Sequence, residues 1–512
     1  MAYLVCNADG LKRRVVSVPN RQLTIYEVNA WVWLSGLSKK SGGPLDLGSV
    51  PSAEWDAIAR YGFDAVWLMG VWERSPAGIA ISNGNAGLVA EFHRTLPDFV
   101  PEDNVGSAYC VRRYVVDQHL GGPQGLAIAR QELARRGMGL ILDFVPNHVA
   151  PDSPWILAHP EHFMQGSAAD FERDPAAYLR IGVKFFARGR DPYFPPWSDV
   201  VQVNAFAPGF RQTVIELLLG VAEQCDGIRC DMAMLLMNNV FAQTWAGRAG
   251  PAPATEYWPT VIDAVKKKHP RFLFIAEAYW DLEWELQQQG FDFCYDKRLY
   301  DRLAHDQPEG IRLHLCADLR YQEKLLRFIE NHDEPRAAAA FPPAKARAAA
   351  ITMATIPGAK LFHDGQFEGQ RIKVPTFLGR RPQEPVDVEG HGFYEKLLAI
   401  IHTPVFRDGV WALCPCLGWP DNQSYQKLEA WCWTRDDDRC LVVVNLSDDP
   451  VQARVHVPWE DVRGKVWRLE DALSDSTYDR DGTEIQNEGL YVELAAWAGQ
   501  IFALRAIGPI KT

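Results

Sequence analysis

The chain has few of the features that mark metal, nucleotide or nucleic-acid sites. Its ten cysteines are scattered, without the paired CxxC spacing of a zinc site, and no Gly-rich phosphate-binding loop is evident. No His-x-His pair follows a predicted strand, which argues against a metal-dependent barrel hydrolase. We therefore expect no bound cofactor, and we expect free thiols of the kind found in cytoplasmic proteins.

Charge and hydropathy exclude further classes of partner. The 512 residues carry a net charge of -12 without a Lys/Arg cluster, which argues against nucleic acid or an anionic membrane surface. No run of 18 apolar residues suggests a membrane span. Residues 1–14 lack the charged start and apolar stretch of a secretory signal. A cytoplasmic protein is predicted, and its oligomeric state stays open.

Four short segments in a fixed order carry the candidate functional residues. They are GLILDFVPNHV (139–149), DGIRCDMA (226–233), FLFIAEAYW (272–280) and FIENHDEPR (328–336). Three begin with an apolar run typical of a buried parallel strand, and each then delivers polar side chains. A strand that turns polar at its C-terminal end is typical of the active site of a (β/α)8 barrel.

The polar residues suit the cleavage of a glycosidic bond, which needs one carboxylic acid and a second carboxylate at the anomeric carbon. Glu277 follows an apolar run and precedes Tyr279 and Trp280, so apolar surroundings are expected to raise its pKa. Arg229 lies two residues before Asp231 and would project to the same side of the strand. Its charge would keep the Asp231 carboxylate ionised.

Each residue taken alone also has a purely structural interpretation. Asp231 could cap a helix or, with Arg229, form a structural ion pair. Tyr109 could be a core residue, and Asp143 is better explained as a strand-end residue than as a catalyst. Trp280 could pack at the rim of the barrel. Only the combination of the four segments favours a catalytic site.

Spacing predicts the domain organisation. Asp143 and Asp231 are 231 − 143 = 88 residues apart, more than one βα unit of about 30 residues needs. We therefore predict an α/β (β/α)8 TIM barrel over 1–149 and 206–408, with an inserted domain at 150–205 after the third strand. Period-two runs beyond it predict an antiparallel β-sandwich over 409–512.

Further elements are expected within the barrel. Residues 24–34 and 62–72 are predicted to be its first two strands, and 291–296 the sixth. The stretch 73–108, rich in Gly, Ser, Asn and Pro, is expected to be an elaborated loop. Residues 210–223 have the periodicity of a barrel helix.

In their order and spacing, the four segments resemble the conserved regions of the α-amylase family, glycoside hydrolase family thirteen. The resemblance covers nearly the whole chain and implies the same barrel, insertion and C-terminal sandwich. It implies that Asp231 is the nucleophile, Glu277 the general acid/base and Asp333 a third carboxylate that grips sugar hydroxyls. It also implies substrate contacts from Tyr109, His148, Arg229 and His332, to which we add Trp280, and it makes Asn147 a candidate calcium ligand.

The chain departs from the family pattern at several positions. Met234 and Leu235 stand where many members have Lys-His, which puts the usual calcium site in doubt and predicts a less polar acceptor side. Arg113 replaces an Asp, and the segment HDGQFEGQR (363–371) is atypical.

The resemblance implies a retaining hydrolase or transglycosylase that cleaves α-glucosidic bonds, with α-1,4 bonds favoured, in maltooligosaccharides or α-glucans through a covalent glycosyl-Asp231 intermediate. The alternatives are an inactive amylase-like binding protein and an isomerase or transferase of the same family that acts on a disaccharide.

Overall fold

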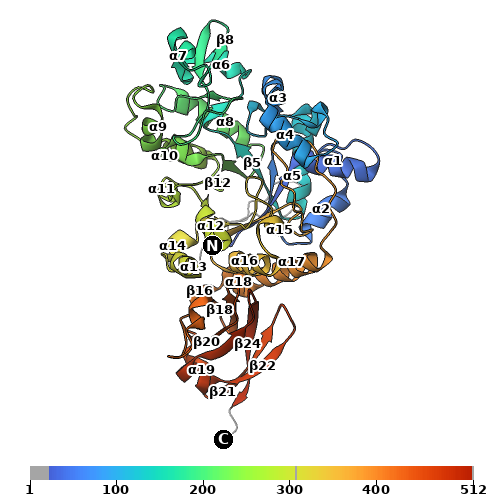
Figure 1. Ribbon diagram of the computed structural model, residues 1–512, viewed down its shortest axis with the longest axis vertical. Helices are drawn as coiled ribbons and strands as arrows, with labels where there is room; N and C mark the ends of the chain where they lie inside the picture. Colours follow the sequence, from blue (N-terminus) through green and yellow to red (C-terminus); the bar gives the residue numbers. More distant parts are fainter. Residues whose placement is uncertain (1–21, 306–307, 510–512) are drawn as a thin grey trace.

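Eight parallel strands close into a barrel in the computed structural model, which describes residues 22–305 and 308–509 (Figure 1). Each strand pairs with the next one along the chain, and the last pairs with the first. The strands are β1 (Thr24–Asn29), β2 (Ala65–Met69), β5 (Gly139–Phe144), β11 (Gly227–Cys230), β12 (Leu273–Ala276), β13 (Phe293–Tyr295), β14 (Leu325–Arg327) and β15 (Ala359–His363). The predicted fold class is confirmed. Residues 1–14, where no secretory signal is expected, lie outside the described residues.

Amphipathic helices cover the barrel. The buried residues of α5 (Gly122–Arg135) include Leu126, Ala129 and Leu133, which recur at the spacing of one helical face. The other main helices are α1 (Ala30–Ser41), α2 (Ser52–Ala59), α8 (Phe210–Ala222), α9 (Asn238–Trp245), α10 (Tyr257–Lys268), α11 (Glu283–Gln288), α12 (Lys297–His305), α13 (Pro308–Leu315), α16 (Pro343–Thr355) and α17 (Val388–Ile401). The expected helix at 210–223 therefore exists almost as predicted.

Three sequence expectations differ from the structure. The strand expected over 24–34 ends at Asn29, whose side chain accepts a hydrogen bond from Val32 N (3.3 Å) and so starts α1. The expected loop at 73–108 contains the helices α3 (Pro76–Asn83) and α4 (Ala86–Thr95), capped by the residues Ser75 and Asn85. The seventh strand, β14, ends before the segment 328–336 begins.

An insertion separates β5 from α8. Its first strand is β6 (His148–Val149), which pairs antiparallel with β10 (Val201–Gln202). The two ends of the inserted segment therefore lie side by side. Between them lie α6 (Pro154–Ala158), η3 (Pro160–His162), α7 (Ala168–Arg173) and a small sheet of β7 (Gln165–Gly166), β9 (Lys184–Ala187) and β8 (Tyr178–Ile181). The insertion and the C-terminal strands lie at opposite ends of the molecule (Figure 1).

Two antiparallel sheets form the C-terminal part. One contains β16 (Val410–Leu413), β18 (Leu428–Arg435), β19 (Asp438–Asn445), β24 (Gly499–Pro509), β21 (Lys465–Asp471) and β22 (Thr477–Asp481), and the other β17 (Cys416–Leu417), β20 (Val451–Val455) and β23 (Leu490–Leu494). Trp431 and Trp433 donate to Thr355 of α16, which joins this part to the barrel. The exact domain boundaries at 149, 205 and 408 stay predictions. Across the described residues, no helix is long and apolar enough to cross a membrane.

Candidate active site

One buried guanidinium joins the three predicted carboxylates. Arg229 Nη1 donates to Asp231 Oδ1 at 2.7 Å, and its Nη2 lies 2.8 Å from Glu277 Oε2 and 3.6 Å from Asp333 Oδ2. Arg229 and Asp231 come from the end of β11, Glu277 follows β12, and Asp333 follows β14. The carboxyl ends of these parallel strands meet at one face of the barrel, which brings the three carboxylates together.

Glu277 is placed to carry a proton near neutral pH. Its side chain is 4% exposed, and burial raises its pKa to about 7, helped by the neighbouring charges of Asp231 and Asp333 and opposed by Arg229. Its oxygens accept from Met232 N at 2.5 Å and from the Tyr279 hydroxyl at 2.8 Å. These bonds fix the orientation of the carboxyl group.

The other two carboxylates have different surroundings. Burial raises the pKa of Asp231, while contact with Arg229 favours its ionised form. Burial also acts to raise the pKa of Asp333, but the charge and hydrogen bond of His332 outweigh it and hold that pKa well below its usual value. The Asp333 side chain remains 38% exposed. Asp333 is therefore an ionised group that solvent or a ligand can reach.

His332 lies between two carboxylates. Its Nδ1 is hydrogen-bonded to Glu27, and its Nε2 lies 2.9 Å from Asp333 Oδ2 and 2.6 Å from the Tyr109 hydroxyl. Burial acts to lower the pKa of His332, but the two carboxylates raise it to about 10. The ring stacks on Tyr109 with the centroids 5.3 Å apart, and Tyr109 also lies over the Arg229 guanidinium.

Two residues of this network were missed by the sequence analysis. Glu27 lies on β1, fully buried, and Tyr295 on β13 accepts a hydrogen bond from Arg229 Nε at 3.2 Å. The sequence did contain a signal for Glu27. A carboxylate inside the apolar strand TIYEVN must be buried, and burial is costly unless the carboxylate has a partner. For Tyr295 there was no such signal, since a tyrosine in a strand is ordinary.

His148 and Asn147 also lie near Tyr109. His148 Nε2 is 3.2 Å from the Tyr109 carbonyl oxygen, and burial lowers its pKa to about 4, so the ring is neutral and donates. Asn147 pairs with Gln202, whose Nε2 donates to Asn147 Oδ1 at 2.8 Å and whose Oε1 accepts from Asn147 Nδ2 at 3.2 Å. Calcium binds six to eight oxygen ligands. The described contacts of Asn147 do not fit such a site, and the expectation of no bound cofactor stays a prediction.

Trp280, three residues after Glu277 in the chain, forms an aromatic pair with Tyr193. Their rings meet edge to face with the centroids 4.9 Å apart, and Tyr193, which belongs to the insertion, is 62% exposed. Trp280 has a left-handed backbone with φ +64°. Met234 and Leu235, by contrast, are fully buried. They pack in the core, and the expectation of a less polar acceptor side stays a prediction.

Asp143 has the structural role that its position suggested. Its carboxylate accepts from Gly70 N at 2.8 Å and from Trp67 Nε1 at 3.2 Å, which joins β5 to the end of β2. Trp67 in turn lies edge to face against His332. Asp143 thus supports the floor of the site without facing it.

The fold and this arrangement resemble those of α-amylase-type barrel proteins. No family model matches the chain. Two curated relatives are similar: the "Alpha-amylase MalA" of Haloarcula japonica (24% identical over 334 residues, 62% of this chain and 44% of that protein) and the "Alpha-1,4-glucan:maltose-1-phosphate maltosyltransferase" of Bifidobacterium longum (28% over 233 residues, 44% of this chain and 25% of that protein). The chain spans less than half the length of either relative.

Solved structures share the fold over almost the whole chain. The noncanonic maltogenic alpha-amylase AmyB from Thermotoga neapolitana has a TM-score of 0.67 at 19% identity, covering 96% of this chain and all of that one. Amy13B of Eubacterium rectale has a TM-score of 0.66 at 14% identity, with 94% and 95% of the two chains covered. The resemblance to the α-amylase family that the four segments predict is confirmed.

Proposed function

We propose that the protein is a retaining enzyme that cleaves α-glucosidic bonds, with α-1,4 bonds in maltooligosaccharides or α-glucans favoured, through a covalent glycosyl-Asp231 intermediate. The observation that carries this proposal is the single guanidinium of Arg229, within 2.8 Å of both Asp231 and Glu277. The names of the two curated relatives, an alpha-amylase and a maltosyltransferase, support an α-glucan as substrate.

The chemistry follows from the charges. Protonated Glu277 gives its proton to the leaving glycosidic oxygen while the Asp231 carboxylate attacks the anomeric carbon. Glu277, now ionised, then takes a proton from water or from a sugar hydroxyl, which attacks the intermediate and releases Asp231. Three carboxylates, of Asp231, Asp333 and Glu27, contact two cationic side chains, Arg229 and His332, and Glu277 ionises as it gives up its proton. The excess of negative charge favours the oxocarbenium-like transition state.

Substrate positioning is assigned to the side chains around this centre. Asp333, partly exposed and ionised, would accept hydrogen bonds from sugar hydroxyls, and Tyr109 would stack under the ring of the glycosyl unit. His148 and His332 are assigned to the subsite of the same sugar, and Trp280 to the border of the acceptor side. Whether water or a sugar is the acceptor depends on this side and not on the three carboxylates. We propose soluble maltooligosaccharides as substrates, with appreciable transfer.

The test is three isosteric variants, Asp231→Asn, Glu277→Gln and Asp333→Asn, assayed on maltotetraose. Because the groups act as a unit, each variant should lose orders of magnitude in kcat while its circular-dichroism spectrum stays native. Near-normal turnover in any of the three would refute the catalytic assignment. Binding of maltotetraose without turnover by the unaltered chain would instead favour the binding-protein alternative.

We also propose a cytoplasmic location. The nine cysteines of the described residues are free thiols, and most of them are buried, which suits a reducing compartment. Localisation of the full chain by fractionation of its native host tests this directly.

A further inference from the structure

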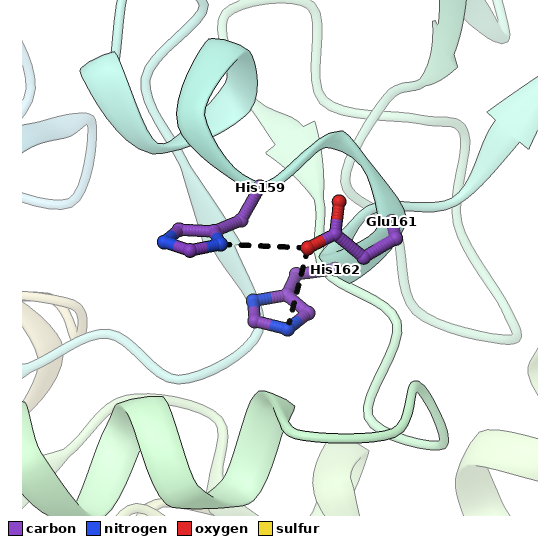
Figure 2. A group of neighbouring side chains, drawn as sticks. All are labelled: His159, Glu161 and His162. Atoms are coloured by element: carbon purple, nitrogen blue, oxygen red, sulfur yellow. Dashed lines mark hydrogen bonds and ion pairs between the residues drawn. The ribbon is translucent and has the colours of Figure 1, made fainter.

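A second cluster of titratable side chains lies in the insertion, between α6 and β7. His159, Glu161 and His162 turn toward one another around the short η3 turn (Figure 2). One possible ligand atom from each of these residues lies within 4.8 Å of those of the other two. Among residues 22–305 and 308–509, this is the group of three or more possible metal ligands that meets this criterion. None of the three is used by the mechanism above.

The distances are close to those of a metal centre. His159 Nδ1 lies 3.4 Å from Glu161 Oε1, and His162 Nε2 lies 4.0 Å from the same oxygen (Figure 2). Zinc bonds of about 2.0–2.1 Å in a tetrahedron separate ligand atoms by about 3.4 Å. The first pair already has this separation, and the second needs a shift of less than about 1 Å. The His159 and His162 rings are stacked, with centroids 5.0 Å apart and 15° between their planes, so side-chain rotation must turn their nitrogens toward one ion.

The surrounding structure holds the ligands in place. The His162 backbone accepts from Asn204 N at 2.7 Å and donates to the His159 carbonyl oxygen at 3.0 Å. Its ring, 7% exposed, packs edge to face on Phe210 at the start of α8. His159 follows the last residue of α6, where its N–H donates to the Trp155 carbonyl oxygen. An ion here would therefore connect the end of α6 to His162, whose ring packs on the start of α8.

The donor atoms indicate the kind of ion. Two imidazoles with one carboxylate suit zinc and similar divalent transition metals, whereas calcium and magnesium prefer oxygen ligands alone. Metal ions bind the neutral form of imidazole and the ionised form of a carboxylate.

We propose that His159, Glu161 and His162 bind a divalent transition-metal ion of the zinc type, with water completing the tetrahedron, and that this ion rigidifies the α6–η3 turn, whose His162 ring packs on the start of α8. The ligands lie within four consecutive residues, so closing the chelate costs little chain entropy. The ion is structural and independent of the carboxylates that perform the proposed reaction. The competing interpretation is an ordinary histidine–carboxylate hydrogen bond on the surface.

The experiment uses the full chain after EDTA treatment and dialysis, titrated with ZnCl2 and with CaCl2 in a calorimeter. One zinc ion per chain should bind, calcium should not, and excess zinc should raise the melting temperature because it binds only the folded state. Hydrogen exchange over residues 154–166 should slow on zinc addition. No zinc binding, or equal binding of calcium, would overturn the proposal.

Variants identify the site. His159→Gln and Glu161→Gln replace side chains that are 45% and 61% exposed, so both variants should fold as the unaltered chain does. Each should weaken zinc binding at least about tenfold, since loss of a ligand costs no less than loss of an outer-shell partner. His119→Gln is the matched control, because His119 also contacts a carboxylate (Asp117, 2.9 Å) and is 79% exposed. Zinc binding that is unchanged in the first two variants, or reduced equally in the control, would assign the ion elsewhere and refute the proposal.

Discussion

Arg229 holds Asp231 and Glu277 with two different nitrogens of one guanidinium, Nη1 at 2.7 Å and Nη2 at 2.8 Å. A planar fork can orient two carboxylates at once, whereas the ammonium of lysine is a point charge on a flexible stem. The spacing of proposed nucleophile and proposed acid is thus set by one side chain. Its burial, together with the stacking of Tyr109, leaves the fork little freedom to move.

The first prediction concerns replacement of the Arg229 guanidinium. Arg229→Lys keeps the charge but not the bidentate geometry, so kcat on maltotetraose should fall by roughly 100-fold or more. Steady-state kinetics with a melting curve will check this. Arg347→Lys is the control, because Arg347 pairs with Glu389 at the surface and should be near neutral. Equal kinetics of the two variants would show that charge alone is sufficient.

The second prediction concerns stereochemistry. Because a covalent glycosyl-Asp231 intermediate inverts the anomeric centre twice, the first product released from an α-linked substrate should be the α-anomer. Proton NMR within the first minutes of reaction, before mutarotation, reads the outcome. The carboxyl groups of Asp231 and Glu277 should be about 5–5.5 Å apart in the complex with substrate. A β-anomer as first product would show that water attacks directly, and the covalent step would be abandoned.

The third prediction is a shift in the pH profile. With the pKa of Glu277 at about 7, kcat/KM should fall on the alkaline side of neutrality as the acid loses its proton. The Tyr279 hydroxyl donates to Glu277 and so favours the ionised form. Tyr279→Phe removes this bond, raises the pKa of Glu277, and should move the alkaline limb to higher pH.

Tyr491→Phe is the matched control for that shift. Like Tyr279, Tyr491 donates to a glutamate two positions away in the chain, in this case Glu493. This pair lies at the exposed face of the C-terminal sheet. Its pH profile should match that of the unaltered enzyme. An alkaline limb that stays in place in Tyr279→Phe, or moves to lower pH, would contradict the assignment of Glu277 as the acid.

The fourth prediction links His332 to stability. Its pKa is raised to about 10 in the folded protein, so its stabilising charge is fully present below its unfolded pKa and is lost as pH rises through about 10. Glu27→Gln removes one of its two carboxylate partners and lowers this folded pKa. The difference in unfolding free energy between the unaltered chain and the variant should therefore be largest near pH 7 and narrow toward pH 10.

Urea unfolding at pH 7, 8, 9 and 10 measures this difference. Asp103→Asn serves as control, because Asp103 pairs with Arg380 at 2.6 Å, no histidine is among its described contacts, and a guanidinium does not titrate in this range. Its destabilisation should be constant with pH. If the difference in unfolding free energy between the unaltered chain and Glu27→Gln is also constant with pH, His332 is not positively charged in the folded protein.

Sequence patterns predicted the barrel and the positions of its carboxylates because both depend on residues that are close together in the chain. A strand end fixes where Asp231, Glu277 and Asp333 emerge, and parallel pairing then brings them together. The contacts of Glu27 with His332 join residues 305 positions apart in the chain, and no local pattern encodes such a distance. The helices within 73–108 were missed because their capping residues and glycines are residue types that are also typical of loops.

The last prediction addresses transfer against hydrolysis. Tyr193 reaches from the insertion to Trp280, three residues after the acid Glu277 in the chain, and presents an exposed ring that a sugar acceptor can stack on. A bound acceptor sugar competes with water for the glycosyl intermediate, so products longer than maltotetraose should form early in the reaction. Tyr193→Ala should lower the ratio of longer to shorter products several-fold and leave total cleavage nearly unchanged. Phe194→Ala, at the adjacent residue with 67% exposure, is the control. If the unaltered enzyme forms shorter products alone, even at high maltotetraose concentration, the enzyme is a hydrolase and the aromatic pair has no role in transfer.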